Sequence, residues 1–302
     1  FCFTIQAELG LTADLEEKIS NQKITKDVIL ATEHPLEILI AEDNLVNQKI
    51  ISTILKHFGY QVTIVENGLL ALEASMKKHY DVIFMDIQMP KMDGVEATTK
   101  IQSHYKKIKV AAPWIIALTA NVFKEDKKKY FETGFDDFLP KPVDRNMVYT
   151  VLKNSFSKES VLKKEFQKVS TDSVSLVRST GIEGEAVLDT VQLAKLFELG
   201  ADTQIEVIKT FLENLPNNLK IIKSAIDEEN SKEVEISSHA LKGEAGYVGA
   251  AQFWRQCQKL ESLADRGEKK QFAGHFSQLE TSSLALEEAL SQYLADLELK
   301  SA

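Results

Sequence analysis

The sequence predicts two domains of different fold class: an α/β domain with a doubly wound, five-stranded parallel sheet, and an all-α antiparallel four-helix bundle. Three observations predict them. Between residues 37 and 153, short β-rich apolar runs alternate with stretches of helical periodicity. Residues 154–187 lose both patterns and are rich in Ser and Thr. From residue 188 to residue 302 only the helical period continues, and residues 1–36 form an N-terminal segment ahead of both domains.

Five apolar runs are expected to form the sheet. They are residues 38–41, 61–65, 82–85, 114–118 and 135–139. Their apolar residues are mostly continuous rather than alternating, which is typical of strands that are buried on both faces of a parallel sheet. Helices are expected over 46–55 and 69–76 and from residue 95 onward, with Gly59 as the stop signal of the first.

The stretch 154–187 predicts a flexible linker of 34 residues, with a short helix near Val161–Val169. Such a linker has a root-mean-square span of roughly 30–35 Å. The helical periods beyond it cover residues 203–229, 231–248, 250–266 and 269–297. Their short connections predict an antiparallel bundle, and Pro216 is expected to kink the first helix.

The composition is that of a soluble globular protein, with 44% hydrophobic and 27% charged residues. The formal net charge is −9, of which residues 188–302 carry −7, so no part is basic enough to predict binding to nucleic acid. Two cysteines are too few for a disulfide framework, and neither a signal peptide nor a bilayer span is visible. We expect a cytoplasmic chain without membrane insertion of its own. It begins with Phe1, which suggests a piece of a longer protein whose parent can be membrane-anchored.

Polar side chains follow the expected strands at the edge where parallel sheets bind ligands. Glu42 and Asp43 follow the first strand, Asp86 the third, Thr119 the fourth and Lys141 the fifth. Three converging carboxylates raise one another's pKa unless a cation lies among them, and such oxygen ligands suit Mg²⁺. A hydroxyl and an ammonium suit phosphoryl oxygens, and a carboxylate can form an acyl phosphate. We therefore expect metal-assisted phosphoryl transfer to an aspartate.

Four motifs carry a family resemblance. They are Ala41-Glu42-Asp43-Asn44, Met85-Asp86-Ile87-Gln88-Met89-Pro90-Lys91-Met92-Asp93-Gly94, Ala117-Leu118-Thr119-Ala120 and Leu139-Pro140-Lys141-Pro142. With these motifs in order, residues 37–153 resemble a response-regulator receiver domain, whose fold is flavodoxin-like (CheY-like).

The resemblance implies roles for particular residues. Asp86 would be the phosphoacceptor. The Mg²⁺ ligands would be Glu42, Asp43, Asp86 and the backbone carbonyl of Gln88. Thr119 and Lys141 would contact the phosphoryl oxygens, Phe138 would be the aromatic switch residue, and the Lys141-Pro142 peptide would be cis. Taken singly, Glu42 or Asp43 would also suit a helix cap, Thr119 a strand end, Phe138 a core position and Lys141 a solvated surface.

His239 is distinguished from the other five histidines by its surroundings. It lies about 200° around the helix from the apolar Leu241 and should face away from the core as an exposed imidazole. Lys242, Gly243 and Gly246 share its face. Glycines inside a helix cost about 1 kcal/mol each, which suggests that another surface approaches closely there. Lys242 is expected to balance phosphoryl charge; the alternative is that it is an ordinary solvated surface charge. No acid–base partner of the histidine is evident.

The motif His-x-Leu-Lys-Gly at 239–243, followed by Gly249-Ala250, resembles that of a histidine-containing phosphotransfer (HPt) domain, as does Phe211–Pro216 in the first helix of the bundle. Residues 188–302 therefore resemble an HPt domain with His239 as phosphoacceptor. Phe1–Ile5 resembles the last strand of a histidine-kinase ATP-binding domain. None of that family's nucleotide-binding motifs is present, so this chain is not expected to bind ATP.

These resemblances imply the output end of a hybrid histidine kinase. Its partners would be an upstream kinase phosphohistidine and a downstream response-regulator receiver, with Mg²⁺ as cofactor. A rival hypothesis is a binding module that phosphorylation switches through Thr119 and Phe138, with the helical bundle as a docking surface. An aspartate-dependent phosphatase fits less well, because Gln88 stands where a second carboxylate would act as general acid. Whether His239 meets Asp86 of its own chain is left open.

Overall fold

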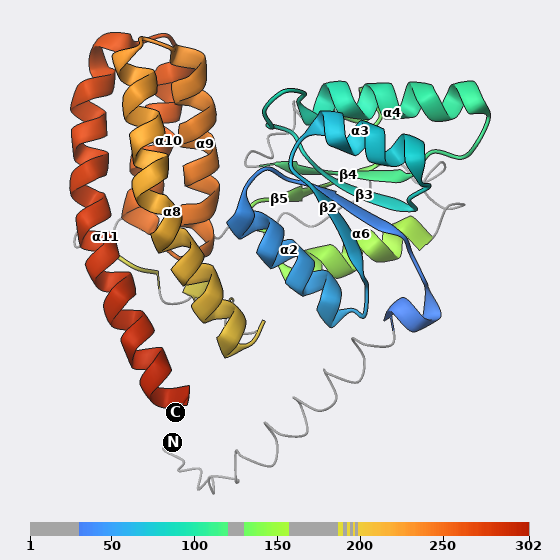
Figure 1. Ribbon diagram of the computed structural model, residues 1–302, viewed down its shortest axis with the longest axis horizontal. Helices are drawn as coiled ribbons and strands as arrows, with labels where there is room; N and C mark the ends of the chain where they lie inside the picture. Colours follow the sequence, from blue (N-terminus) through green and yellow to red (C-terminus); the bar gives the residue numbers. More distant parts are fainter. Residues whose placement is uncertain are drawn as a thin grey trace, which may run out of the picture.

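The computed structural model describes residues 30–119, 130–156, 187–189, 192–193, 196 and 199–301. An α/β domain and a helical domain lie side by side (Figure 1). The strand expected at Phe1–Ile5 and the linker helix expected at Val161–Val169 lie outside the described residues. Within the described part of the chain, no helix combines the length and the apolar character needed to cross a membrane.

The α/β domain contains the predicted five-stranded parallel sheet. Its strands are β1 (Ile38–Ala41), β2 (Val62–Val65), β3 (Val82–Asp86), β4 (Trp114–Thr119) and β5 (Asp137–Pro140). Their order is β2-β1-β3-β4-β5, and every neighbouring pair is parallel. Ile38 pairs with both Val62 and Val82, so the carboxyl ends of β1 and β3 reach the same edge. The predicted fold class of this domain is confirmed.

Helices cover both faces of the sheet (Figure 1). They are α2 (Leu45–His57), α3 (Gly68–Lys77), α4 (Gly94–Ile108) and α6 (Arg145–Phe156). Because side chains alternate across a strand, Ile40 and Phe84 pack with α2 and α6, whereas Leu39 and Ile83 pack with α3 and α4. Helix α6 is not among the helices predicted from the sequence. This helix ends at Phe156, whose ring stacks on His34 at 4.1 Å.

Short polar side chains begin three of these helices. Asn44, Asn67 and Asp93 each accept a hydrogen bond from a backbone N–H in the first turn of α2, α3 and α4. Each bond satisfies one of the N–H groups that has no partner inside its helix. Asn44 directly follows Glu42 and Asp43, so this cap fixes where the loop after β1 ends.

The helical domain is the predicted bundle. Its helices are α8 (Ala201–Asp227), α9 (Ser231–Tyr247), α10 (Ala251–Asp265) and α11 (Phe272–Ser301), with a short 3₁₀ turn, η2 (Lys269–Gln271), before the last. Helix α9 buries an apolar stripe in the bundle; its members are Val234, Leu241 and Ala245, with Val248 at the helix end. Pro216 is exposed within α8, which continues through it as one helix.

The two domains share one apolar contact. Helix α2 of the α/β domain packs against α8 and α9 of the bundle. Ile50 and Ile54 of α2 line a crevice together with Leu196, Leu199 and Tyr247 of the helical domain. Buried side chains from both domains form one continuous hydrophobic cluster across this contact.

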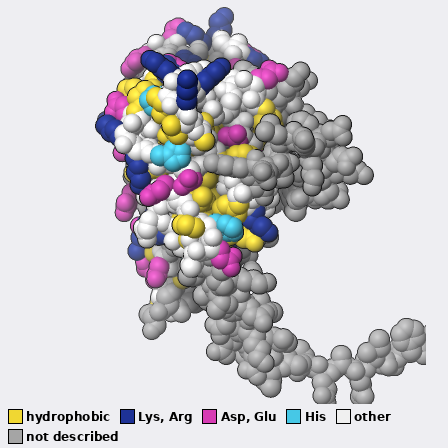
Figure 2. Space-filling view, turned by 90° about the vertical axis from the view of Figure 1, so that its right-hand side faces the viewer, with side chains coloured by type: hydrophobic (Ala, Val, Ile, Leu, Met, Phe, Trp, Pro, Cys, Tyr) yellow, Lys and Arg dark blue, Asp and Glu magenta, His cyan; other side chains and the backbone are white. Residues whose placement is uncertain are grey.

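On the face of the α/β domain that is turned away from the bundle, hydrophobic side chains are distributed differently. Figure 2 shows hydrophobic side chains there in separate areas between acidic and basic groups. The continuous apolar contact between the two domains lies along α2.

Gly94, the first residue of α4, generates a stability prediction. A Cβ at this position would lie 2.0 Å from the backbone oxygen of Asp86, so Gly94→Ala must displace the end of β3. We expect the free energy of unfolding of the α/β domain to fall by about 1–3 kcal/mol. Hydrogen exchange of peptides from each domain, measured across a urea series, reports this change.

Gly274→Ala in α11 is the matched control, because nothing lies within 4 Å of its Cβ position. Alanine is the better helix former, so this variant should stabilise the bundle by about 0.5–1 kcal/mol. If the α/β domain of Gly94→Ala unfolds at the same urea concentration as that of the unmodified chain, this would contradict the close approach of α4 to β3.

Candidate functional site

The three predicted carboxylates meet at the carboxyl edge of the sheet. Glu42 and Asp43 follow β1, and Asp86 is the last residue of β3. Their carboxylate oxygens all lie within 4.8 Å of one another. Glu42 is fully buried and Asp86 is 3% exposed, so their charges are shielded from water and interact strongly.

Lys141, directly after β5, lies among these carboxylates. Its Nζ is 2.7 Å from Asp86 Oδ2 and 2.8 Å from Glu42 Oε2. Its side chain is only 4% exposed, so Lys141 is not the solvated surface residue that it could have been when taken singly. Its backbone N–H donates to the carbonyl of Thr119 at 2.7 Å, and the Lys141-Pro142 peptide is cis. Burial opposes the charge of Lys141, but the two carboxylates outweigh it and raise the pKa of the ammonium.

The remaining charge is negative. Burial, followed by the nearby charge of Asp86, raises the pKa of Glu42 to about 8 and that of Asp43 to about 6. Among the described residues, the ammonium of Lys141 is paired with this cluster of three carboxylates, so the cluster has room electrostatically for a further cation. Its donors are all carboxylate oxygens, which is the ligand type that Mg²⁺ prefers. Gln88 lines the same pocket, and its N–H donates to Asp86 Oδ1 at 3.3 Å.

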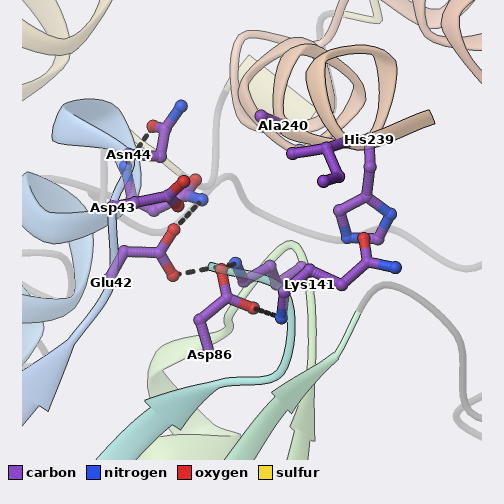
Figure 3. A pocket seen from close by; sticks show the side chains of 11 residues that line it. Glu42, Asp43, Asn44, Asp86, Lys141, His239 and Ala240 are labelled. Carbon is purple, nitrogen blue, oxygen red and sulfur yellow. Dashed lines mark hydrogen bonds and ion pairs between the residues drawn. The ribbon is translucent and has the colours of Figure 1, made fainter. Parts of the chain in front are cut away.

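His239 of the helical domain faces this cluster. Figure 3 shows its ring pointing from α9 across a pocket toward Asp86 and Lys141. The pocket is lined from both domains, with Asp43 and Asn47 on one side and Ala240 and Gly243 on the other. The histidine side chain is 14% exposed, so the expectation of an exposed imidazole is wrong: the α/β domain and Glu261 cover it.

Glu261 on α10 is an acid–base partner of His239 that was not predicted from the sequence. Its Oε1 lies 2.6 Å from His239 Nδ1, and its Oε2 accepts from Lys242 Nζ. Burial opposes ionisation of Glu261, but His239 and Lys242 outweigh it and lower its pKa. An ionised carboxylate only accepts hydrogen bonds, so the histidine hydrogen lies on Nδ1 and Nε2 is available to the pocket. Lys242 is 8% exposed at its side chain and reaches His239 through Glu261.

A positional signal for Glu261 was present in the sequence. His239 and Glu261 are each eleven residues from Ala250, which lies in the turn between α9 and α10. In two antiparallel helices, residues at equal distances from the connection lie at about the same level along the two axes. Helical period alone describes one helix at a time, so it identified the face of His239 but not its partner.

The glycines of α9 face the α/β domain, as their cost inside a helix suggested. A Cβ on Gly243 would lie 3.7 Å from Asn47 Nδ2, and one on Gly246 would lie 3.8 Å from Pro142 Cδ. Both are ordinary contact distances, so a side chain larger than alanine would separate the domains here.

Two predicted residues lie beside the pocket rather than in its lining. Thr119 ends β4 and is 6% exposed, and its carbonyl holds the backbone of Lys141. Phe138 lies half-buried on β5, with its ring 6.3 Å from that of Phe131.

Two hydrogen bonds cross between the domains next to the pocket. The side chain of Asn44 donates from Nδ2 to Glu244 Oε1 on α9. The backbone N–H of Val143 donates to Tyr247 Oη at 2.7 Å. An ion pair of 2.5 Å between Lys49 of α2 and Glu206 of α8 lies farther along the contact. The bundle therefore holds the two loops that carry the acidic pair and Lys141.

Comparisons with known proteins agree with this division of the chain. Residues 38–153 match the family model for the response regulator receiver domain, and residues 206–297 match that for the Hpt domain. The chain is 30% identical over 237 residues to sensor histidine kinase GacS of Pseudomonas protegens, an alignment that covers 78% of this chain and 25% of the relative. It is 28% identical to aerobic respiration control sensor protein ArcB of Escherichia coli, covering 75% of this chain and 28% of the relative.

Among solved structures, the receiver domain of sensor histidine kinase PA1611 from Pseudomonas aeruginosa is 37% identical. It covers 40% of this chain and 98% of that chain, with a TM-score of 0.37, and holds a magnesium ion in its active site cleft. The chain spans about a quarter of the length of the curated relatives that it matches.

The Val143–Tyr247 bond generates a prediction about docking of the two domains. Tyr247→Phe removes the acceptor and leaves the Val143 N–H without its partner, which should weaken docking by about 1–3 kcal/mol. We expect faster amide exchange at Val143, measured by nuclear magnetic resonance, and a larger radius of gyration in small-angle X-ray scattering.

Tyr293→Phe is the matched control, because Tyr293 Oη accepts from Gln204 Nε2 inside the bundle at 3.1 Å. It should leave the exchange of Val143 unchanged. Equal protection of the Val143 amide in Tyr247→Phe and in the unmodified chain would show that this bond does not hold the domains together.

Proposed function

Because the chain joins a response regulator receiver domain to an Hpt domain, a pairing that indicates phosphorelay signalling, we propose that it passes a phosphoryl group between Asp86 and His239 of the same molecule. Both domains are phosphotransfer modules. The observation that carries the proposal is that Asp86 and His239 line one pocket between the two domains. Holding two reacting groups together in this way removes much of the entropic barrier to their reaction.

The side chains present suit such a transfer. His239 Nε2 attacks the phosphorus of an acyl phosphate on Asp86, and a nitrogen–phosphorus bond forms as the phosphorus–oxygen bond to Asp86 breaks. The electron pair of the broken bond leaves on the Asp86 carboxylate, which Lys141 stabilises from 2.7 Å. The imidazole becomes positively charged, and Glu261 at Nδ1 balances this charge. The reverse transfer uses the same groups in the opposite order.

We assign the cation site to Glu42, Asp43, Asp86 and the backbone carbonyl of Gln88. The three side chains converge within 4.8 Å, and within the described part of the chain the ammonium of Lys141 balances only part of their charge, which supports this assignment. Mg²⁺ bound there would neutralise charge on the phosphoryl oxygens. Thr119 and Lys141 would contact these oxygens, and Phe138 would act as the switch residue.

The role of Lys242 is indirect in this proposal. Its ammonium lies on Glu261 and not in the lining of the pocket, so it would balance phosphoryl charge on His239 by holding Glu261 in place.

The chain would be the output end of a longer hybrid sensor histidine kinase, as its share of the matched relatives supports. We propose domain limits of 37–153 and 188–302, joined by the linker 154–187 and preceded by the segment 1–36. An upstream phosphohistidine would load Asp86, and a downstream receiver would unload His239. The location would be the cytoplasmic side of a parent that can be membrane-anchored.

The dependence of the transfer rate on protein concentration distinguishes transfer within one molecule from transfer between molecules. The chain is loaded at Asp86 from acetyl phosphate in the presence of Mg²⁺, and base-stable label on His239 is then followed over time. We expect a rate constant that does not change with protein concentration, because the two groups are already together. The control is a mixture of Asp86→Asn chains and His239→Gln chains, which can react only between molecules. At micromolar concentration this mixture should transfer roughly 1000-fold more slowly, since a tethered domain has an effective concentration near the millimolar range.

Two outcomes would refute the proposal. One is a rate proportional to protein concentration in the unmodified chain. The other is unchanged transfer from a cognate phosphodonor in both Asp86→Asn and His239→Gln. Loss of partner binding in Asp86→Asn alone, with His239→Gln silent, would favour a switched binding module instead.

Mg²⁺ binding should depend on pH in a defined direction. Carboxyls with raised pKa values, about 8 for Glu42 and about 6 for Asp43, hold protons at low pH and must release them to bind the cation. We expect the apparent Mg²⁺ affinity to rise about tenfold per pH unit near pH 7, with release of about one proton. By the same linkage, the cation-free domain loses stability as the pH rises through this range.

Isothermal titration calorimetry in buffers of different ionisation enthalpy measures this proton release. Glu42→Gln is the informative variant, because it removes the group with the higher pKa and should abolish most of the release near pH 7. An affinity that stays constant between pH 6 and pH 8 would contradict the assignment of the acidic cluster as the cation site.

A further inference from the structure

Glu244 is a buried carboxylate that the transfer step does not use. It lies on α9, five residues after His239, and is 3% exposed. Its Oε1 accepts from Nδ2 of Asn44 in the receiver domain and from Nδ2 of Asn218 in α8 at 3.1 Å. One of its two donors therefore comes from the other domain.

The stability of the charge on such a buried carboxylate depends strongly on the hydrogen-bond donors that surround it. Burial raises the pKa of Glu244 to about 7, the bonds from Asn44 and Asn218 oppose this rise, and the charge of Asp43 adds to it. A buried charge that loses a hydrogen-bond partner is destabilised far more than an exposed one. A docked domain without a donor at this place would leave Glu244 with Asn218 and a nearby negative charge.

The donor of Asn44 is fixed in direction by the helix cap. Its Oδ1 accepts from the N–H of Asn47 at 3.1 Å, so the amide oxygen must face α2 and the Nδ2 group must face Glu244. Asn47 in turn donates from Nδ2 to Glu42 Oε1 at 2.7 Å. Glu244 therefore contacts the residue directly after the acidic pair, in a loop whose geometry is set by the site itself.

We propose that Glu244 is a partner-selecting residue: its carboxylate accepts a receiver domain that presents a hydrogen-bond donor directly after the acidic pair, and rejects one that presents a carboxylate there. This inference rests on the proposed transfer between Asp86 and His239. Any receiver that docks on α9 in the same orientation brings that position against Glu244. Selection of this kind combines one attraction with one repulsion.

An exchange of side chains tests the pair in the full chain. Asn44→Asp keeps the cap of α2, because aspartate caps helices as well as asparagine does, but turns a carboxylate toward Glu244. Glu244→Gln keeps an acceptor for Asn44 and Asn218 and adds a donor. The double variant Asn44→Asp/Glu244→Gln restores one donor and one acceptor with their positions reversed. All variants are compared at pH 8, which lies above the raised pKa of Glu244, so that this carboxylate is ionised.

Two readouts are followed for each variant. Small-angle X-ray scattering reports the docked fraction, and base-stable label on His239, divided by phospho-Asp86, reports transfer independently of loading. We expect Asn44→Asp to lower the docking equilibrium constant calculated from that fraction, and the transfer rate, by roughly 10- to 100-fold, Glu244→Gln to change them little, and the double variant to recover most of the loss. Asn44→Asp combined with Glu280→Gln, an exposed position on α11, is the control and should not recover.

The inference is overturned if Asn44→Asp docks as well as the unmodified chain, or if the double variant is no better than Asn44→Asp alone. Failure of the proposed function has a different signature. In that case the unmodified chain shows no concentration-independent transfer, while scattering still tests the Asn44–Glu244 pair, because docking is measured without any phosphoryl group.

Discussion

The buried ammonium of Lys141 is the interaction on which the rest of the site depends. It lies 2.7–2.8 Å from Asp86 and Glu42, so it joins the ends of β5, β3 and β1 at one point. Its backbone N–H is bonded to Thr119, which adds the end of β4. The charge of Lys141 opposes the rise that burial and the charge of Asp86 cause in the pKa values of Glu42 and Asp43. Because Lys141 balances only part of their charge, the same arrangement that lets the domain fold also leaves an attraction for a cation.

The contact between the domains uses the loops that this cluster holds in place. Asn44 follows the acidic pair, and Val143 follows Lys141 by two residues, so the bundle is bonded directly to both sides of the site. Any movement of these loops that accompanies a change at Asp86 changes the surface seen by α9. By thermodynamic reciprocity, docking of α9 also favours one arrangement of the acidic cluster. The donor group of Asn44 thus connects the state of the site to the choice of partner.

Most of the fold was predictable because its signals are local. Continuous apolar runs identified all five strands, and the 3.6-residue period identified the four long bundle helices to within a few residues. The acidic site was predictable because parallel strands bring their carboxyl ends to one edge. Glu261, Glu244 and Tyr247 were missed, because their roles come from contacts between helices or between domains, and no period within one segment encodes such a contact. Gly243 and Gly246 indicated that a surface approaches α9, but not which surface.

A relay requires that this docking be reversible, and the contact is built accordingly. His239 is covered by the receiver domain of its own chain, so the same face must separate before another receiver can reach Nε2. A flexible linker of 34 residues, which the composition predicts, would supply an effective concentration near the millimolar range. Docking therefore needs only modest intrinsic affinity to be well populated. Three polar links, Asn44–Glu244, Val143–Tyr247 and Lys49–Glu206, lie beside the apolar contact along α2. Recognition can then depend on one buried carboxylate, because a like charge placed against a buried carboxylate opposes docking.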